Sequence, residues 1–239
     1  MEITVDGIKI SYERYVGDGA PVLLLHGWGA GKAAMGGLFE FIKSLGRSVI
    51  SMDFPFFGSS DPPPSDWGVE DYAECTFKFM TALGVEKAVI VGHSFGGRIG
   101  IILAADKKAA VEKLVLIDSA GLKPRRGVRY RLKVLCYKLK KRFGCATQSS
   151  GSSDYNALPD FMKPVFVRVV NTYLDDRLKK IDAPTLLLWG SEDKDTPMYM
   201  AKKFEKKIND SGLAVLEGAG HFSYSDRFVQ TCAILKSFL

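Results

Sequence analysis

The sequence predicts an α/β fold: a mostly parallel, doubly wound sheet with an N-terminal antiparallel hairpin and a helical insertion. Three observations predict it. Short, continuously apolar runs alternate with amphipathic stretches. The 239 residues suffice for one such domain with an insertion. A composition of 46% hydrophobic and 25% charged residues is ordinary for a globular protein.

The first strands are predicted as a hairpin, because EITV and IKISYERY flank Asp6-Gly7, a strong two-residue turn signal. Six later runs are apolar throughout and bounded by turn residues, which is typical of strands buried on both faces of a parallel sheet. These runs are 21–27, 48–53, 87–92, 113–118, 183–190 and 213–218.

The stretches between these runs predict helices, at about 34–45, 69–83, 95–105, 197–208 and 225–238. Strand, helix and strand in repetition indicate right-handed crossovers. In such sheets ligands bind beyond the carboxyl ends of the strands. We therefore look for functional residues where each strand ends.

One region, residues 122–180, lacks a buried strand and is predicted as helices separated by a polar SSGSS loop. We expect it to form a cap over the carboxyl side of a core made of residues 1–121 and 181–239. Within it, residues 122–142 hold ten of the 33 Lys and Arg residues and no acid. Val128, Leu132, Leu135, Leu139 and Phe143 fall three or four apart, which predicts an amphipathic basic helix.

Two interpretations of that basic segment stay open. The first is a cap helix with its apolar stripe over the pocket and its charges in water. The second is docking of residues 122–142 onto an acidic partner, either an acyl carrier protein or an anionic membrane surface. Nucleic acid is not expected, because the segment lacks interleaved exposed aromatics and a known reading motif.

The compartment predicted from the sequence is the cytoplasm. The N-terminus lacks the basic start and apolar core of a signal peptide, and no uncharged run approaches the length of a membrane span. The four cysteines, Cys75, Cys136, Cys145 and Cys232, lack metal-ligand spacing and are expected to be free thiols. No metal or organic cofactor is expected.

The stretch GHSFGG, residues 92–97, follows a predicted strand and opens a predicted helix. A turn this tight strains its apex and needs residues almost without side chains two positions before and after it. Gly92 and Gly96 meet that need and place Ser94 at the apex, as a candidate nucleophile. The Phe95 N–H would then point toward an oxyanion. The alternative is a glycine-rich packing turn.

A serine nucleophile needs a base, usually histidine. The chain has three histidines, all at strand ends. His221 is the best candidate, because it lies on a glycine-flanked loop late in the chain, whereas His93 is expected to pack and His26 to brace its loop. A carboxylate should orient the base. The strand 183–190 offers Glu192, Asp193 and Asp195, and Asp118 is the alternative from another strand.

Five motifs, in order, resemble the α/β-hydrolase superfamily: HGWG (26–29), DFPFFGSSD (53–61), GHSFGG (92–97), WGSEDKDTP (189–197) and GAGHFSY (218–224). The resemblance implies the α/β-hydrolase fold, with Ser94 as nucleophile, His221 as base and Asp193 as acid. It also implies that the Trp28 N–H joins that of Phe95 in an oxyanion hole. Serine at position 94 disfavours relatives with an aspartate nucleophile.

The expected activity is hydrolysis of a small or medium acyl ester through an acyl-enzyme. Two alternatives stay open: a carbon–carbon bond hydrolase of vinylogous diketones, and a ligand receptor on the same scaffold. Phe56 stands where many relatives have glycine, which predicts a narrowed pocket. We expect the pocket lining to include His26, Gly27, Phe56, Phe57, His93 and Phe222.

Overall fold

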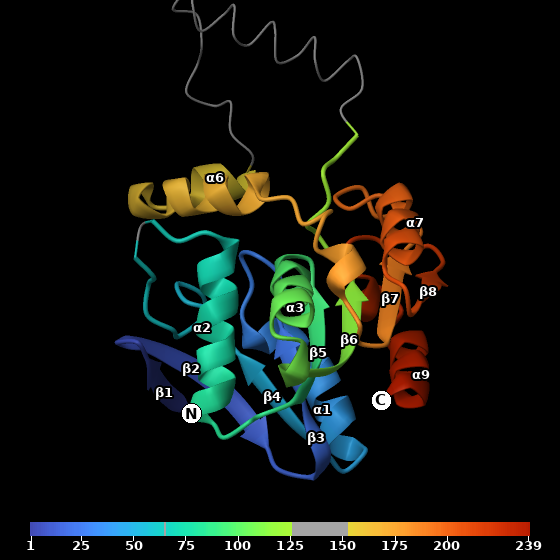
Figure 1. Cartoon of the computed structure of the whole chain (residues 1–239), viewed down its shortest axis with the longest axis horizontal. Helices are drawn as coiled ribbons and strands as arrows, with labels where there is room; N and C mark the ends of the chain where they lie inside the picture. Colours follow the sequence, from blue (N-terminus) through green and yellow to red (C-terminus); the bar gives the residue numbers. More distant parts are fainter. Residues whose placement is uncertain (65, 126–152) are drawn as a thin grey trace, which may run out of the picture.

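A computed structural model of the chain describes residues 1–64, 66–125 and 153–239. They form one eight-stranded sheet with helices on both faces (Figure 1). The strands are β1 (Glu2–Val5), β2 (Ile8–Tyr15), β3 (Asp18–Leu25), β4 (Arg47–Met52), β5 (Ala88–His93), β6 (Val111–Ile117), β7 (Thr185–Gly190) and β8 (Ser211–Leu216).

The strand order is β1-β2-β4-β3-β5-β6-β7-β8. Strand β1 pairs antiparallel with β2, and β2 pairs antiparallel with β4. The remaining neighbours in the sheet, from β4 through β3 to β8, are parallel. Asp6 and Gly7 have φ of 48° and 82°, which is the backbone of a two-residue hairpin turn. The predicted fold class and the N-terminal hairpin are therefore confirmed.

The principal helices are α1 (Gly36–Ser44), α2 (Val69–Ala82), α3 (Phe95–Asp106), α7 (Met198–Lys207) and α9 (Phe228–Phe238). The prediction for 225–238 was wrong at its start, because a separate short helix, α8 (Ser223–Asp226), precedes α9. Arg227 separates the two with φ −124° and ψ 49°, which lie outside the helical range.

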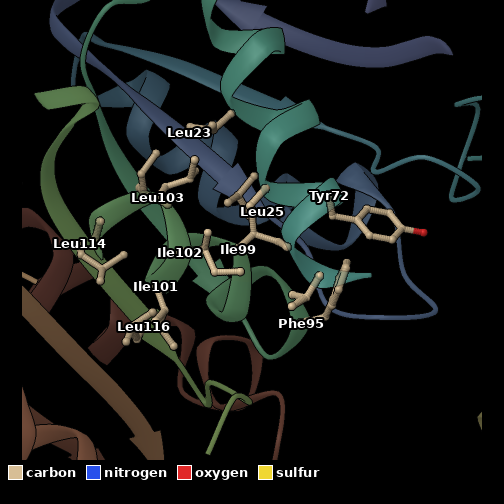
Figure 2. Packing of buried hydrophobic residues seen from close by; sticks show 14 of the residues in the cluster. Leu23, Leu25, Tyr72, Phe95, Ile99, Ile101, Ile102, Leu103, Leu114 and Leu116 are labelled. Atoms are coloured by element: carbon tan, nitrogen blue, oxygen red, sulfur yellow. The ribbon is translucent and has the colours of Figure 1, made fainter. Parts of the chain in front are cut away.

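Two hydrophobic cores flank the sheet, because successive side chains of a strand point to opposite faces. In β3, Leu23 and Leu25 pack with the helices of one face, whereas Val22 and Leu24 pack with those of the other. The first core includes α2, α3 and α7, and the second includes α1 and α9. Figure 2 shows part of the first core, where residues of α3 lie between Leu23 and Leu25 of β3 and the β6 residues Leu114 and Leu116.

Residues 153–180 contain α5 (Ser153–Ala157), α6 (Lys163–Asn171) and three-residue 3₁₀ turns at Asp160–Met162 and Leu178–Lys180. Figure 1 shows α6 crossing above α2 and α3. Met162 and Val165 are fully buried and belong to the first core. The predicted basic helix at 128–143 lies outside the described residues, so docking of segment 122–142 and the cap boundaries at 122 and 180 stay predictions.

Cys75 and Cys232 are free and buried, whereas Cys136 and Cys145 lie outside the described residues. Within the described ranges, each helix is too short or too polar to cross a lipid bilayer.

Candidate active site

Ser94 lies at the apex of the turn between β5 and α3, with φ 49° and ψ −105°. A non-glycine residue adopts a positive φ of this kind only where the surrounding structure enforces it. A Cβ added to Gly92 would lie 2.5 Å from the Gly96 carbonyl oxygen, and one added to Gly96 would lie 2.2 Å from that of Leu25. The two glycines therefore allow the chain to cross itself and support Ser94 at the end of the sheet.

The imidazole of His221 lies between the hydroxyl of Ser94 and the carboxylate of Asp193. His221 Nε2 is 3.0 Å from Ser94 Oγ, and His221 Nδ1 is 2.9 Å from Asp193 Oδ2. The three residues follow or end different strands, β5, β7 and β8. The fold thus brings the three predicted residues into one hydrogen-bonded chain.

The pKa values of this pair move in opposite directions. Burial disfavours the charged form of Asp193, but hydrogen bonds from His221 and Thr196 outweigh it and lower the pKa of Asp193. Burial likewise opposes protonation of His221, but the hydrogen bond and charge of Asp193 raise the pKa of His221 above 6.5. The pair is therefore built to stabilise an imidazolium next to a carboxylate.

Asp193 is held by its own loop. The backbone N–H groups of Asp195 and Thr196 donate to Asp193 Oδ1 at 2.8 and 3.0 Å, and the Thr196 hydroxyl donates to Oδ2 at 2.6 Å. Glu192 and Asp195, the other carboxylates of this loop, are exposed. The geometry selects Asp193 as the partner of His221.

Asp118, the alternative carboxylate, binds backbone instead. Its two oxygens accept the N–H groups of Gly190 and Ser223 at 2.8 and 3.0 Å. Burial raises the pKa of Asp118 to about 7, although these hydrogen bonds oppose the rise. Asp118 ties β6 to the loops that carry Asp193 and His221, so its contacts are those of a structural residue.

The two predicted oxyanion donors, the backbone N–H groups of Trp28 and Phe95, belong to residues that line the same cavity as Ser94. Neither N–H donates a hydrogen bond within the described part of the chain. The side chains fix these backbones, because the Trp28 and Phe95 rings pack edge to face with centroids 5.2 Å apart. Phe95 also packs against Tyr72, as Figure 2 shows.

The other two histidines brace the loops around the site. His26 Nε2 accepts the Phe54 N–H at 3.0 Å, and His26 Nδ1 lies 2.8 Å from the Gly27 carbonyl. His93 Nε2 lies 2.8 Å from the carbonyl of His221. Burial lowers the pKa of both to about 4. Both rings are therefore neutral near pH 7.

A cavity of about 440 Å³ opens beside Ser94. Of the residues predicted to line it, Gly27, His93 and Phe222 do so. His26, Phe56 and Phe57 are absent from its described lining. His26 is fully buried, and the Phe57 ring packs edge to face against Trp28 with ring centroids 5.0 Å apart.

The Phe56 ring packs against Phe57 and Phe161. Its φ of 80° lies in the left-handed region that glycine adopts without strain. Phenylalanine at this position of the motif therefore places backbone strain in the loop.

The sequence did not predict the part of the lining that comes from α6 or from the interior of α3. The α6 residues are Phe166, Val169 and Val170, and the α3 residue is Arg98. Arg98 had a signal that could have been used, because it is the single charged residue in the apolar stretch FGGRIGIILAA. The α6 residues had no comparable signal.

Asp193, Asp195 and His221 place one ligand atom each within 4.8 Å of one another, a spacing that a metal ion could use. Both ring nitrogens of His221 already lie within hydrogen-bond distance of Asp193 or Ser94. The donor set therefore suits proton transfer along the chain of three residues better than metal coordination.

Comparison with known proteins agrees with this geometry. A family model described as the alpha/beta hydrolase fold matches residues 20–135. An uncharacterized hydrolase of Bacillus subtilis, YugF, is 27% identical over 256 residues, covering 94% of this chain and 92% of that protein. The 2-hydroxy-6-oxo-6-(2'-aminophenyl)hexa-2,4-dienoic acid hydrolase of Metapseudomonas resinovorans is 28% identical over 250 residues, covering 92% and 84%.

A solved structure of Est816, an N-acyl homoserine lactone degrading enzyme, superposes with a TM-score of 0.78 at 25% identity and full coverage of both chains. The chain therefore has the α/β-hydrolase fold and is similar in sequence and structure to members of the α/β-hydrolase superfamily. These comparisons support hydrolase chemistry, and the bond that the chain would act on is a separate question.

Proposed function

We propose that this protein is a serine hydrolase that cleaves a small or medium carboxylic ester through an acyl-enzyme. The observation that carries the proposal is the His221 imidazole, with one ring nitrogen 3.0 Å from Ser94 Oγ and the other 2.9 Å from Asp193. A serine hydroxyl is a weak nucleophile until a base takes its proton, and this arrangement supplies the base.

In the proposed reaction, Ser94 Oγ attacks the ester carbonyl while its proton passes to His221 Nε2. The Trp28 and Phe95 N–H groups would hold the oxyanion, and the loss of one such donor typically costs about 10²- to 10³-fold in kcat. His221 then protonates the leaving alcohol, and water, activated by the same imidazole, releases the acid from Ser94. Phe166 and Val169 provide apolar surface for an acyl chain.

A second candidate, hydrolysis of a carbon–carbon bond in a vinylogous diketone, is favoured by one comparison. The relative from Metapseudomonas resinovorans is named as a hydrolase of a 2-hydroxy-6-oxo-hexadienoic acid. Esters come first in our proposal because the described wall offers apolar side chains, such as Phe166 and Val169, to an acyl chain.

Turnover of 4-nitrophenyl esters of graded acyl length, measured beside a 2-hydroxy-6-oxo-hexa-2,4-dienoic acid, tests the choice between bonds. We expect ester hydrolysis with an optimum at one chain length, abolished by Ser94→Ala and retained by Ser44→Ala. Ser44 is a matched control, because it is exposed and bonds only its own helix. If the dienoic acid is cleaved faster than every ester, carbon–carbon bond hydrolysis would replace the ester proposal. If the protein reacts with an organophosphonate but turns over neither substrate, it would be a receptor.

A further inference from the structure

Arg98 is a charged residue in the wall of the candidate active site that the proposed chemistry leaves without a role. It is the fourth residue of α3, one helical turn beyond Ser94, which is roughly 6 Å along the helix axis. Its residue exposure is 8%, and it lines the same cavity as Ser94 and His221. A guanidinium buried this deeply is normally paired with an acid.

No acid pairs with Arg98 among the described residues. Its recorded hydrogen bond runs from Nη1 to the carbonyl oxygen of Thr172, the residue that ends α6. Burial lowers the pKa of Arg98 to about 10, and the opposing charge that raises it is Tyr173 instead of an aspartate or glutamate. The side chain stays protonated near pH 7 without a carboxylate to neutralise it.

The guanidinium has five N–H donors, and one carbonyl accepts from it within the described chain. Arg98 lines the cavity together with Ala120, Val169 and Val170, and its other N–H groups have no described acceptor. A planar anion in the cavity could accept two of these N–H groups side by side.

Charge around the cavity favours one orientation and one kind of anion. Asp195 is the acid in the described lining, and its carboxylate lies within 4.8 Å of a ring nitrogen of His221. It would repel an anion bound on that side of the cavity. Because His221 protonates the leaving alcohol, the alcohol must lie at His221, and the acyl group is left with the rest of the cavity, whose lining includes Arg98 and residues of α6. One cation balances one carboxylate, whereas a phosphate dianion would require a second cation.

We propose that the cavity selects esters whose acyl group ends in a carboxylate, and that Arg98 binds that carboxylate while Ser94 attacks the ester carbonyl. This inference rests on the proposed function. Arg98 thereby acts as a specificity-determining residue, and the preferred substrate is a monoester of a dicarboxylic acid.

The competing role of Arg98 is structural, since its bond to the Thr172 carbonyl ties α3 to the end of α6. Kinetics separate the two roles. Mono-4-nitrophenyl esters of dicarboxylic acids of increasing length would each be compared with the same ester methylated at the free carboxyl, after subtraction of uncatalysed hydrolysis. We expect the wild-type protein to prefer the free acid at one chain length.

Arg98→Gln should lower kcat/KM for the preferred acid about 10- to 100-fold, the effect of a lost hydrogen bond to a charged group. The methylated ester should change by less than about threefold, and Arg98→Lys should restore part of the preference. Arg14→Gln is the matched control, because exposed Arg14 also bonds a carbonyl at a helix end, that of Leu83. It should leave both esters unchanged.

Equal losses for the acid and the methylated ester in Arg98→Gln, or a wild-type preference for the methylated ester, would overturn the inference. Calorimetry with the free dicarboxylic acid and the Ser94→Ala protein gives an independent measurement. Suppose that the acid binds the Ser94→Ala protein but not the Ser94→Ala/Arg98→Gln protein, while the wild-type protein hydrolyses no ester. That result would support the anion site and reject the proposed function. Neither binding nor turnover would reject both.

Discussion

The imidazole of His221 must be neutral before it can accept the proton of Ser94, so the rate should rise with pH through the pKa of His221. Burial opposes protonation, but Asp193 and the nearby charge of Asp195 raise that pKa above 6.5. We expect the acid limb of kcat/KM to have its midpoint above 6.5. Asp195→Asn removes one of these charges and should move the midpoint to lower pH, with little change in the plateau.

The matched control for this shift is Glu192→Gln, which makes the same change of charge on the same exposed loop. Its midpoint should move less than that of Asp195→Asn. A profile of kcat/KM against pH checks both variants. An acid limb that is identical in all three proteins would contradict a role for His221 as the titrating base.

Asp193 fixes the tautomer of His221, and its replacement by asparagine should be severe. An amide nitrogen facing His221 Nδ1 would favour the tautomer with its proton on Nε2, which cannot accept from Ser94. We expect Asp193→Asn to lower kcat by about 10⁴-fold with the fold retained. Steady-state kinetics with circular dichroism as a check of folding would measure it.

Thr196→Val is the control for this carboxylate. It removes the hydroxyl that donates to Asp193 Oδ2 but leaves the bond between Asp193 and His221 in place. Its loss in kcat should be far smaller. Comparable losses in the two variants would show that the position of the loop, and not the carboxylate itself, is what the reaction needs.

For single residues, the sequence predicts those whose role depends on neighbours along the chain. It misses those whose role depends on contacts with distant parts of the chain. Ser94 was predictable because Gly92 and Gly96 reflect the geometry of a single turn. Asp193 needed the family resemblance, because its neighbours offered equally plausible carboxylates. Phe56 and Phe57 are absent from the described cavity lining, and a motif does not indicate which way a loop side chain points. Arg98 was missed although its charge stands alone in an apolar helical stretch.

Among the elements, the turn from β5 to α3 is the one most sensitive to added volume. A Cβ on Gly96 would meet the Leu25 carbonyl at 2.2 Å and the Leu25 Cβ at 2.8 Å, both within the sheet that α3 covers. Backbone cannot yield as a flexible side chain can. We expect Gly96→Ala to destabilise the protein by about 2 kcal/mol or more and to displace Ser94.

Gly36→Ala is the matched control. Gly36 opens α1 with φ −58°, and a Cβ there meets nothing within 4 Å. Alanine should stabilise α1 by up to about 1 kcal/mol. Denaturant unfolding of both variants checks the contrast, and a neutral Gly96→Ala would show that the elbow tolerates a side chain.

The strands were predictable element by element, because apolar runs bounded by turn residues reflect burial on both faces. The ends of the helices were harder to predict than the strands. The stretch 225–238 has one continuous apolar period, but Arg227 leaves the helical range and donates from Nε to the Glu217 carbonyl at 2.8 Å. That contact joins the helix start to the loop before His221, and it is invisible to a local pattern.

Across the whole molecule, the parallel sheet determines where the chemistry lies. The pairing of β5, β6, β7 and β8 in register brings the carboxyl ends of the strands to one edge, where Ser94, Asp193 and His221 meet. Alternating chain order was enough to predict this edge. How α6 covers this edge could not be predicted, because its position depends on long-range contacts that periodicity does not encode. Phe166 of α6 packs against Trp28, and the Leu174 N–H that follows α6 donates to the Gly121 carbonyl.

The central claim is that three side chains from separate strand ends act as one proton-transfer unit on Ser94. The most direct test is the rate of covalent modification by a fluorophosphonate, with the modified residue located by peptide mass spectrometry. We expect rapid modification of Ser94 alone in the wild-type protein, and its loss in His221→Ala at unchanged folding. Modification at another residue, or Ser94 labelling at the same rate without His221, would contradict the account.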